Sequence, residues 1–196
     1  MTKPLIPLTE QDGLRLKELS RAQEAEYGRD TGAFTLGTGE DAHAKGFAGE
    51  IAVIKYLETD FKLVSGQSVG HCPIGSAFDV YAGEPDHRRF LHVKTGFYNS
   101  WPARDAPFGV HAHQRVEETN APLILCSVLK SNRNEVRIEG YVTPWELAAA
   151  RVVLKGEQFP NRSYRSRTDN RLTYIGEYKP LVSIEAMFND VDSPPG

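Results

Sequence analysis

The stretch Phe90-Leu91-His92-Val93-Lys94-Thr95 contains the alternation of apolar and polar residues that tells most about the fold and function of this chain. Its alternation predicts a β-strand with His92 and Lys94 on one face. The earlier stretch Ser76-Ala77-Phe78-Asp79-Val80-Tyr81 predicts another strand, and its Asp79 lies thirteen residues before His92. Consecutive strands can lie side by side, so we expect a carboxylate, an imidazole and an ammonium group to converge.

Length and composition indicate one globular domain over residues 1–196. Of these residues 40% are hydrophobic and 25% are charged, which is ordinary for a single sizeable core. No stretch approaches the roughly 18 apolar residues that cross a bilayer, and Met1 to Leu8 lacks the apolar core of a secretory signal. We therefore expect a soluble, cytoplasmic protein with no membrane partner.

Charge, cysteine content and motifs argue against several classes of protein. The net charge of −3 gives no overall attraction to nucleic acid, so such binding requires a local basic patch. Cys72 and Cys126 are too few for a disulfide framework, and neither belongs to the CxxC pair of a structural zinc site. GxSxG, GxGxxG and phosphate-loop motifs are absent, so serine catalysis and nucleotide binding are poorly supported.

Two helices are expected in the N-terminal part. Thr9 to Tyr27 has helical spacing, with Asp12 as the capping partner of Thr9 and Gly28 after the end. Residues 29–40 predict a loop, so residues 1–40 form an N-terminal helix and loop. A second helix runs from about Asp41 to Leu57, with Glu50 at the edge of its apolar stripe. An inward carboxylate needs a partner.

The middle of the chain predicts a meander followed by a buried strand. Strands are expected at Phe61–Val64, Ala77–Ala82 and Phe90–Thr95, separated by turns at Gly70–Gly75 and Gly83–His87. Residues 96–108 are irregular and aromatic. A helix from about Val110 to Glu118 then leads into the apolar run 121–129, which is long enough for a central strand.

The C-terminal part begins with a strand at Val136–Val142. Thr143-Pro144-Trp145-Glu146 combines a capping residue, a proline at the first helical position and a glutamate at the third, so a helix begins there and runs to about Val153. A strand near Leu172–Ile175 and an apolar segment at 181–188 follow. Residues 156–188 thus hold a basic insertion and C-terminal elements, and residues 189–196 form a frayed tail.

This order of elements resembles the PD-(D/E)XK nuclease superfamily over residues 41–155: helix with Glu50, strand, strand with Asp79, strand with Val93-Lys94, helix, central strand, and a strand ending in Gly140-Tyr141-Val142-Thr143-Pro144. The resemblance implies a restriction-endonuclease-like α/β core, with a mixed central β-sheet flanked by helices. It also implies divalent-metal-dependent hydrolysis of phosphodiester bonds.

The resemblance assigns a role to each site residue. Asp79 is the central metal ligand, Glu50 assists it, the carbonyl of Val93 supplies another ligand, and Lys94 handles the attacking water. Gln114 in His113-Gln114-Arg115 matches the polar residue that the following helix of the family often carries. The phenylalanine before Asp79 stands where the family has proline, which matters little.

His92 is the larger departure, because the family expects glutamate or aspartate at this position. Mg²⁺ prefers carboxylate, carbonyl and water ligands, whereas imidazole suits Mn²⁺ and softer transition metals better. Either His92 is a ligand in a modified site, or the site has lost its metal. The expected cofactor is Mg²⁺ or Mn²⁺.

Each of these residues also has a purely structural interpretation. Glu50 can pair with Lys45 or Lys55 on a solvated helix edge. Lys94 can be an edge-strand lysine. Asp79 is disfavoured in a strand by β-propensity, which favours a functional role. His71, His87, His111 and His113 have no acidic partner at metal-ligand spacing, so we expect surface or capping roles for them.

The basic segment from Arg151 to Arg171 is the candidate nucleic-acid surface. Guanidinium groups can fork onto phosphates, and an interleaved tyrosine can stack on an unpaired base. The expected contacts are Arg162, Tyr164, Arg165, Arg167 and Arg171. The alternative is a solvated insertion.

The sequence therefore predicts a metal-dependent deoxyribonuclease, with DNA preferred over RNA as substrate. Its oligomeric state is left open, and a homodimer is compatible with the sequence. The alternative is a non-catalytic nucleic-acid-binding or protein-interaction module on a degenerate nuclease fold.

Overall fold

A six-stranded mixed β-sheet is the centre of the structure, a computed structural model that describes residues 3–27, 39–60, 67–74, 76–161 and 163–194. Its order is β1-β7-β6-β4-β3-β2. Strands β4 and β6 are parallel, and the other neighbouring pairs are antiparallel. The strands are β1 (Leu5–Pro7), β2 (Ser68–His71), β3 (Val80–Gly83), β4 (Arg89–Tyr98), β6 (Leu123–Leu129) and β7 (Glu135–Val142).

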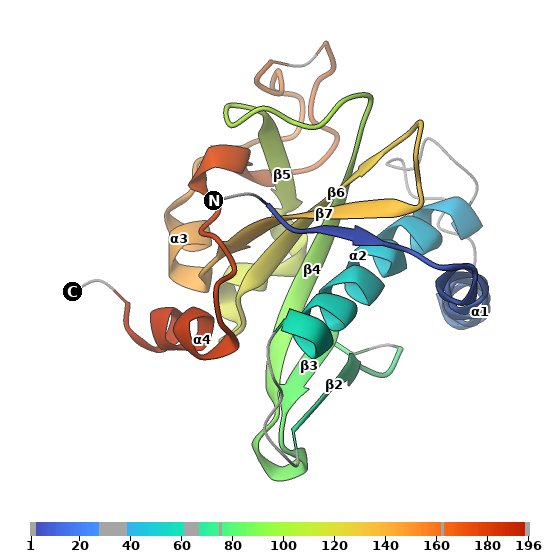
Figure 1. Ribbon diagram of the computed structural model, residues 1–196. Helices are drawn as coiled ribbons and strands as arrows, with labels where there is room; N and C mark the ends of the chain where they lie inside the picture. The colour runs from blue at the N-terminus through green and yellow to red at the C-terminus, as the bar shows by residue number, and fades with distance from the viewer. Residues whose placement is uncertain (1–2, 28–38, 61–66, 75, 162, 195–196) are drawn as a thin grey trace.

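Helices and a second, three-stranded sheet surround this sheet, so the expected α/β class is confirmed. Helix α2 lies across one face, and α1 packs beside it (Figure 1). The α-helices are α1 (Glu10–Tyr27), α2 (Gly39–Asp60), α3 (Pro144–Ala149) and α4 (Ile184–Asp192). The second sheet has the order β5-β9-β8, with β5 (Pro107–His111), β8 (Val152–Val153) and β9 (Asn170–Tyr174).

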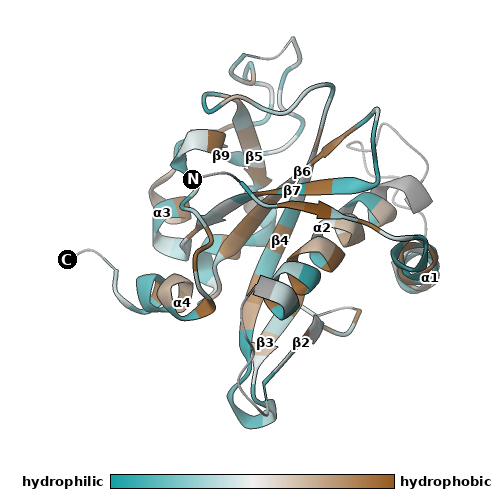
Figure 2. Cartoon of the chain, in the orientation of Figure 1, coloured by the Kyte–Doolittle hydropathy of each residue, from teal (hydrophilic) through white to brown (hydrophobic). Residues whose placement is uncertain are grey.

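Strand β6 lies between two hydrophobic clusters, because its successive side chains point alternately to the two faces of the sheet. Ile124 and Cys126 pack with the buried residues of α2, while Leu123 and Leu125 pack on the opposite face with Val110 and other residues of the crossover and α3. All of β6 up to Val128 is buried, which confirms the expected central strand. Figure 2 shows hydrophobic positions along the strands and an alternation of hydrophobic and hydrophilic positions along α2. Among the described residues, no helix is both long and apolar enough to cross a membrane.

Helix α2 approaches the sheet most closely at Gly49. A Cβ atom there would collide with Thr95 Oγ1 of β4 and would lie 3.3 Å from Cys126 Cβ and from Val93 Cγ1. Thr95 Oγ1 donates to the Gly46 carbonyl at 3.4 Å, and Cys126 Sγ lies 3.8 Å from the Gly49 carbonyl. The absence of a side chain at Gly49 therefore sets the height of α2 above β4 and β6.

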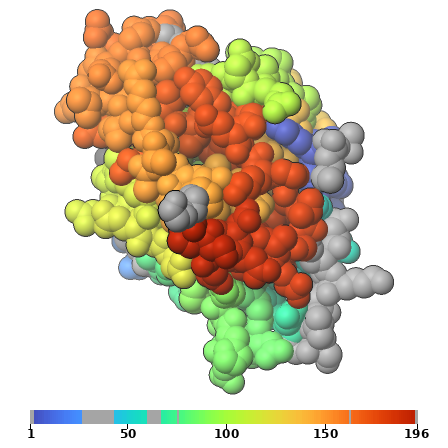
Figure 3. Space-filling view, turned by 90° about the vertical axis from the view of Figure 1, so that its left-hand side faces the viewer, coloured from blue at the N-terminus to red at the C-terminus, as the bar shows by residue number. Residues whose placement is uncertain are grey.

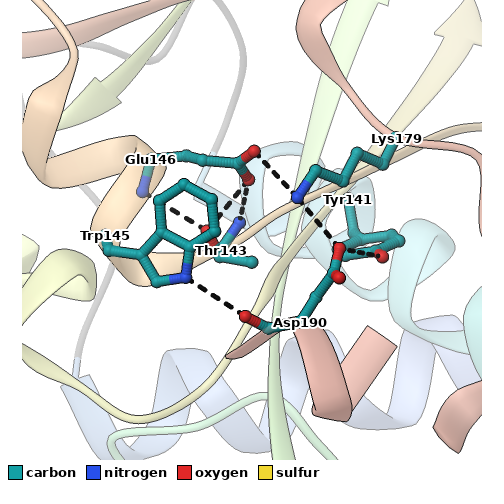
Figure 4. A network of polar contacts seen from close by, with 6 residues as sticks. All are labelled: Tyr141, Thr143, Trp145, Glu146, Lys179 and Asp190. Carbon is teal, nitrogen blue, oxygen red and sulfur yellow. Dashed lines mark hydrogen bonds and ion pairs between the residues drawn. The ribbon is translucent and has the colours of Figure 1, made fainter. Parts of the chain in front are cut away.

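The C-terminal helix is held against α3 and β7 by a polar network (Figure 4). Lys179 Nζ bridges Glu146 Oε1 and Asp190 Oδ2, both at 2.9 Å. Tyr141 donates its hydroxyl to Asp190 Oδ2 at 2.8 Å, and Trp145 Nε1 donates to the Asp190 carbonyl at 3.2 Å. Because Asp190 is fixed from three sides, the expected frayed tail from residue 189 is wrong: α4 continues to Asp192.

Local signals predicted several elements correctly. Thr9 and Asp12 cap α1 reciprocally at 2.7 and 3.2 Å, and Thr143 and Glu146 form the expected capping box of α3. Strands β4, β6, β7 and β9 lie within three residues of their expected bounds. Residues 29–38 of the expected loop lie outside the described residues, and residues 39–40 begin α2. The expected strand Phe61–Val64 lies entirely outside the described residues.

The expected helix at Val110–Glu118 is wrong. Val110 belongs to β5, which pairs with β9, and two short 3₁₀ helices follow at Ala112–Gln114 and Val116–Glu118. Arg115 between them has a φ of 48°, which a continuous helix does not allow. Two other 3₁₀ helices lie at Pro85–His87 and Ile175–Glu177.

Other element boundaries also differ from expectation. Helix α3 ends at Ala149 rather than near Val153, because residues 152–153 pair with β9 as β8. Strand β1 was not expected, since its three residues are recognisable only through their pairing with β7. The expected turn from Gly70 begins instead within β2, where Gly70 makes room for the Tyr81 ring: a Cβ would lie 2.7 Å from the Tyr81 hydroxyl oxygen.

The close contact of α2 makes a prediction about stability. Gly49→Ala should lower the free energy of unfolding by about 1–3 kcal/mol, because α2 must move away from β4. Gly46→Ala is the matched control: a Cβ there meets nothing within 4 Å, so this variant should gain about 0.5–1 kcal/mol from helix propensity. Urea denaturation measures both. Adding Thr95→Ala to Gly49→Ala should recover part of the loss, and equal stability of the two glycine variants would contradict the contact.

Candidate functional site

Asp79 lies where β3 leaves β4. The last backbone pairing on this side joins Asp79 N–H to the Leu91 carbonyl at 3.1 Å. The next donor along β4, Val93 N–H, is satisfied by the side chain instead, through Asp79 Oδ2 at 2.7 Å. The two strands therefore separate at Asp79, and its carboxylate occupies the notch between them.

The carbonyl of Val93 faces the same notch. In an antiparallel pair, the N–H and C=O of one residue point to the same neighbouring strand. Val93 N–H points toward Asp79, so the Val93 carbonyl is directed to the same edge, beyond the last pairing of β3. A carboxylate and a backbone carbonyl thus border the notch, which is the ligand pair that the resemblance implied.

Lys94 adds an ammonium group to this pair. Its Nζ lies 3.8 Å from Asp79 Oδ2, and the two side chains are each 26% exposed. A partly exposed lysine at this distance is screened by water, so it contributes little to stability. It remains accessible to a ligand of the notch.

Glu50 reaches the same region from α2. The residue is 8% exposed, and His71 Nδ1 lies 3.0 Å from its Oε2. Burial raises the pKa of the Glu50 carboxyl; the hydrogen bond from His71 opposes this, Asp79 adds to it, and Lys94 opposes it. The pKa of Glu50 thus responds to charged groups of two other parts of the chain, Asp79 before β3 and Lys94 of β4.

His71 is the site residue that sequence reasoning missed, since a surface or capping role was expected. It pairs with Val80 in the ladder of β2 and β3, and Val80 packs in the cluster beneath α2, so His71 faces the helix. Its side chain is only 9% exposed. Nδ1–H donates to Glu50, which leaves the lone pair on Nε2. In the described part of the chain this buried Nε2 has no hydrogen-bond partner. The sequence predicted a turn at Gly70–Gly75, so the place of His71 in a strand that faces α2 was not expected.

His92 lies on the other face of the sheet. Val93 packs beneath α2, so its neighbours His92 and Lys94 share the opposite face, as expected from alternation. His92 is 3% exposed and its ring lies 5.3 Å from that of Phe78. It is therefore separated from Glu50 and His71 by the sheet.

The tautomer of His92 follows from its partner. Thr119 Oγ1 donates to the Val116 carbonyl at 2.7 Å, so it accepts from His92 Nε2–H at 3.0 Å. The lone pair is then on Nδ1. Burial lowers the pKa of His92 to about 4, against an opposing effect of Asp79, and Lys94 lowers it further. The ring is neutral at pH 7.

Two other expectations concern ligands of the site. Gln114 lies in the 3₁₀ helix Ala112–Gln114 rather than on the expected α-helix, and its side chain is exposed. Within the described ranges, no three His, Cys, Asp or Glu side chains form a group that could hold a metal ion.

The basic segment is only partly free to meet a ligand. Arg171 is committed to the protein: its guanidinium bonds Glu117 Oε1 at 2.9–3.0 Å and the Ala148 carbonyl at 2.9 Å. Arg165 is exposed and donates to the Gly156 carbonyl at 2.7 Å, and Tyr164 is 54% exposed with its ring 5.7 Å from that of Phe159. Arg167 is exposed as well. Arg162 lies outside the described residues.

The lowered pKa of His92 makes a prediction about pH. Between about pH 6.5 and 4 the unfolded chain binds a proton that the folded chain excludes, so stability should fall as the pH is lowered through this window. The contribution of His92 is on the order of 3 kcal/mol, lost by pH 4. The contribution of His92 is the difference between the unfolding free energies of the native chain and of His92→Gln, measured across this pH window. Equal pH slopes for the two proteins would contradict it.

Comparison with protein-family models, with curated proteins and with solved structures found no match to this chain. The arrangement of Glu50, Asp79, Val93 and Lys94 at the notch between β3 and β4 is therefore the basis for any statement about function.

Proposed function

We propose that this chain is a divalent-metal-dependent nuclease with a restriction-endonuclease-like core, acting on DNA in preference to RNA. The observation that supports this most is the position of Asp79, just before β3, where its carboxylate bonds Val93 N–H and lies 3.8 Å from Lys94 Nζ of β4. Glu50 of α2 adds a second carboxylate, whose pKa is affected by both Asp79 and Lys94. Two carboxylates and an ammonium group in a partly open notch are suited to a phosphodiester and a cation.

The residues present fit a hard divalent cation. Asp79 and Glu50 offer carboxylate oxygens and Val93 a carbonyl oxygen, and these are the ligands that Mg²⁺ and Mn²⁺ prefer. Such a cation, when bound, would polarise the phosphate and acidify water. A buried Glu50 with a raised pKa also gives a reason for a cation here, because positive charge would stabilise its ionised form.

Lys94 and His71 would then have distinct tasks. Lys94 Nζ, close to Asp79, donates a hydrogen bond to the attacking water and balances charge that develops on the phosphate oxygens. His71 is a positioning residue: by donating to Glu50 Oε2 it fixes the direction of that carboxylate. His92 supports the strand through Thr119 and keeps a neutral ring beneath the notch.

Nucleic acid would be held by the exposed part of the basic segment. Arg165 and Arg167 supply guanidinium groups for phosphates, and Tyr164 offers an exposed ring for stacking. Arg162, which lies outside the described residues, joins this set by its place in the sequence alone. Arg171 is left out of this set because its ion pair with Glu117 already uses the guanidinium.

One observation favours the alternative of a non-catalytic binding module on the same fold. His92 replaces the acidic residue that the family uses, and it is buried and bonded to Thr119. The notch thus has one carboxylate fewer than the family's pattern. Direct metal titration separates the two proposals, because a binding module of this kind needs no cation.

The nuclease proposal is tested by cleavage of plasmid, single-stranded DNA, branched DNA and RNA with Mg²⁺ or Mn²⁺. Asp79→Asn keeps an acceptor for Val93 N–H but removes the charge, and Lys94→Gln removes the ammonium, so each should lower the rate at least about 100-fold. Asp86→Asn and Lys130→Gln, both at exposed positions, are matched controls with unchanged rates. If Asp79→Asn is folded and fully active, or if the native chain neither binds Mn²⁺ in calorimetry nor cleaves any substrate, the nuclease proposal fails.

The basic segment makes a separate prediction. Arg165→Ala combined with Arg167→Ala should weaken DNA binding across sequences and reduce the slope of log K against log salt by roughly 1.5–2, because each phosphate contact releases counterions. Arg15→Ala with Arg21→Ala on the exposed face of α1 is the control pair. Arg171→Ala should instead lower the melting temperature. Fluorescence anisotropy at several salt concentrations measures the slopes, and an unchanged slope returns the segment to a solvated insertion.

A further inference from the structure

A cavity of about 540 Å³ lies between the segment before β1, strand β7, Tyr56 of α2, Arg104 and residues 175–182. None of the notch residues lines it. On the face seen in Figure 3, the N-terminal segment, in blue, adjoins the segment after β9, in red, and both contribute to the cavity wall. This volume is in the usual range of small-molecule sites.

A β-bulge places a carboxylate in the wall of this cavity. In the pairing of β6 with β7, Leu125 lies opposite Gly140 and Cys126 opposite Ile138, so Glu139 is the extra residue. Gly140 has a φ of 136°, and a Cβ there would collide with the Lys179 carbonyl. The bulge re-aims Glu139, whose side chain is completely buried. A buried charge in this position requires partners.

Glu139 is paired with two cationic side chains, of which Lys3 lines the cavity and Arg137 lies behind it. Lys3 Nζ lies 2.6 Å from Oε2, and Arg137 Nε donates to Oε1 at 2.8 Å. Arg137 also stacks over the Trp101 ring, with 4.7 Å to its centroid, so it is fixed. Lys3 lines the cavity with its side chain 32% exposed, and it is held in place by the carboxylate.

Arg104 is the second cationic residue in the lining of this cavity. It is an exposed lining residue, and among the described residues it makes no ion pair. Gly176 allows this close packing, since a Cβ there would lie 3.1 Å from the Arg104 carbonyl. The charged lining residues are Lys3, Arg104 and Glu139, so the lining has one positive charge in excess.

The rest of the lining is apolar. Ile138 and Leu181 are buried, and Val182 is 52% exposed. Tyr56 completes this wall, and its hydroxyl donates to the Leu181 carbonyl at 3.1 Å, which fixes the segment after β9 against α2. The cavity thus combines an apolar surface with two basic side chains, Lys3, which is paired with Glu139, and Arg104, which makes no ion pair among the described residues.

We propose that this cavity is a binding site for a small organic anion, with an apolar ring or chain and one carboxylate or phosphate group. The apolar body lies against Ile138, Leu181 and Val182. The anionic group accepts hydrogen bonds from Arg104 and from Lys3, which Glu139 holds in place. This site is independent of the proposed nuclease function, because the two share no residue.

The test uses the full chain and two fluorescent probes of similar shape. 1-Anilinonaphthalene-8-sulfonate carries a negative charge, and N-phenyl-1-naphthylamine does not. The anionic probe should bind saturably at one site and about tenfold more tightly than the neutral one. Arg104→Gln should remove this difference, Val182→Trp should abolish binding by filling the cavity, and Arg151→Gln, which does not line the cavity, should change neither. Melting curves check that each variant is folded.

Competition then identifies the anionic group. 1-Naphthoate and 1-naphthyl phosphate should displace the anionic probe, and the stronger competitor shows whether the site prefers a carboxylate or a phosphate. Equal affinity for the charged and neutral probes, full binding by folded Arg104→Gln or Val182→Trp, or no displacement by either competitor would overturn the proposal. None of these readouts depends on cleavage of nucleic acid.

Discussion

The contact between Gly49 of α2 and Thr95 of β4 determines where the candidate site can form. Because no side chain separates them, the helix rests directly on the strand, and the next residue, Glu50, is brought to the level of the sheet. Asp79 reaches the same level in the plane of the sheet, since its carboxylate replaces a backbone partner of β4. A helix lifted by one methyl group would carry Glu50 away from both Asp79 and His71.

Burial of Glu50 disfavours its ionised form, and the surrounding residues offset this effect only in part, so its pKa stays raised. Desolvation and Asp79 both disfavour its charge, and His71 and Lys94 favour it. Replacing a buried ion pair by apolar side chains is often neutral or stabilising, so stability alone does not account for the burial of Glu50. The cation-rich cavity at Glu139 differs, because there two basic side chains satisfy both carboxylate oxygens within the protein.

Elements with a local signal could be predicted from the sequence, and those defined by distant partners could not. The capping box at Thr143 needs only four residues, and the apolar run of β6 marks itself as central. Gly70 was misread because glycine signals a turn, whereas here it makes room for the ring of Tyr81 from the adjacent strand; His71 was lost with it. Likewise, charge patterning could not reveal that Arg171 is already paired with a glutamate 54 residues away.

The crossover between the parallel strands β4 and β6 has a consequence for the order of folding. Such crossovers are usually helices that pack locally, but this one contains β5, whose partner β9 ends at Tyr174. While the chain is synthesised, the cover of the sheet face with Leu123 and Leu125 therefore stays incomplete until Ile175 and Tyr178 have emerged. Pairings over such long separations form slowly and leave apolar surface open to association. The second sheet therefore cannot form until β9 has been synthesised, because β9 pairs with both β5 and β8.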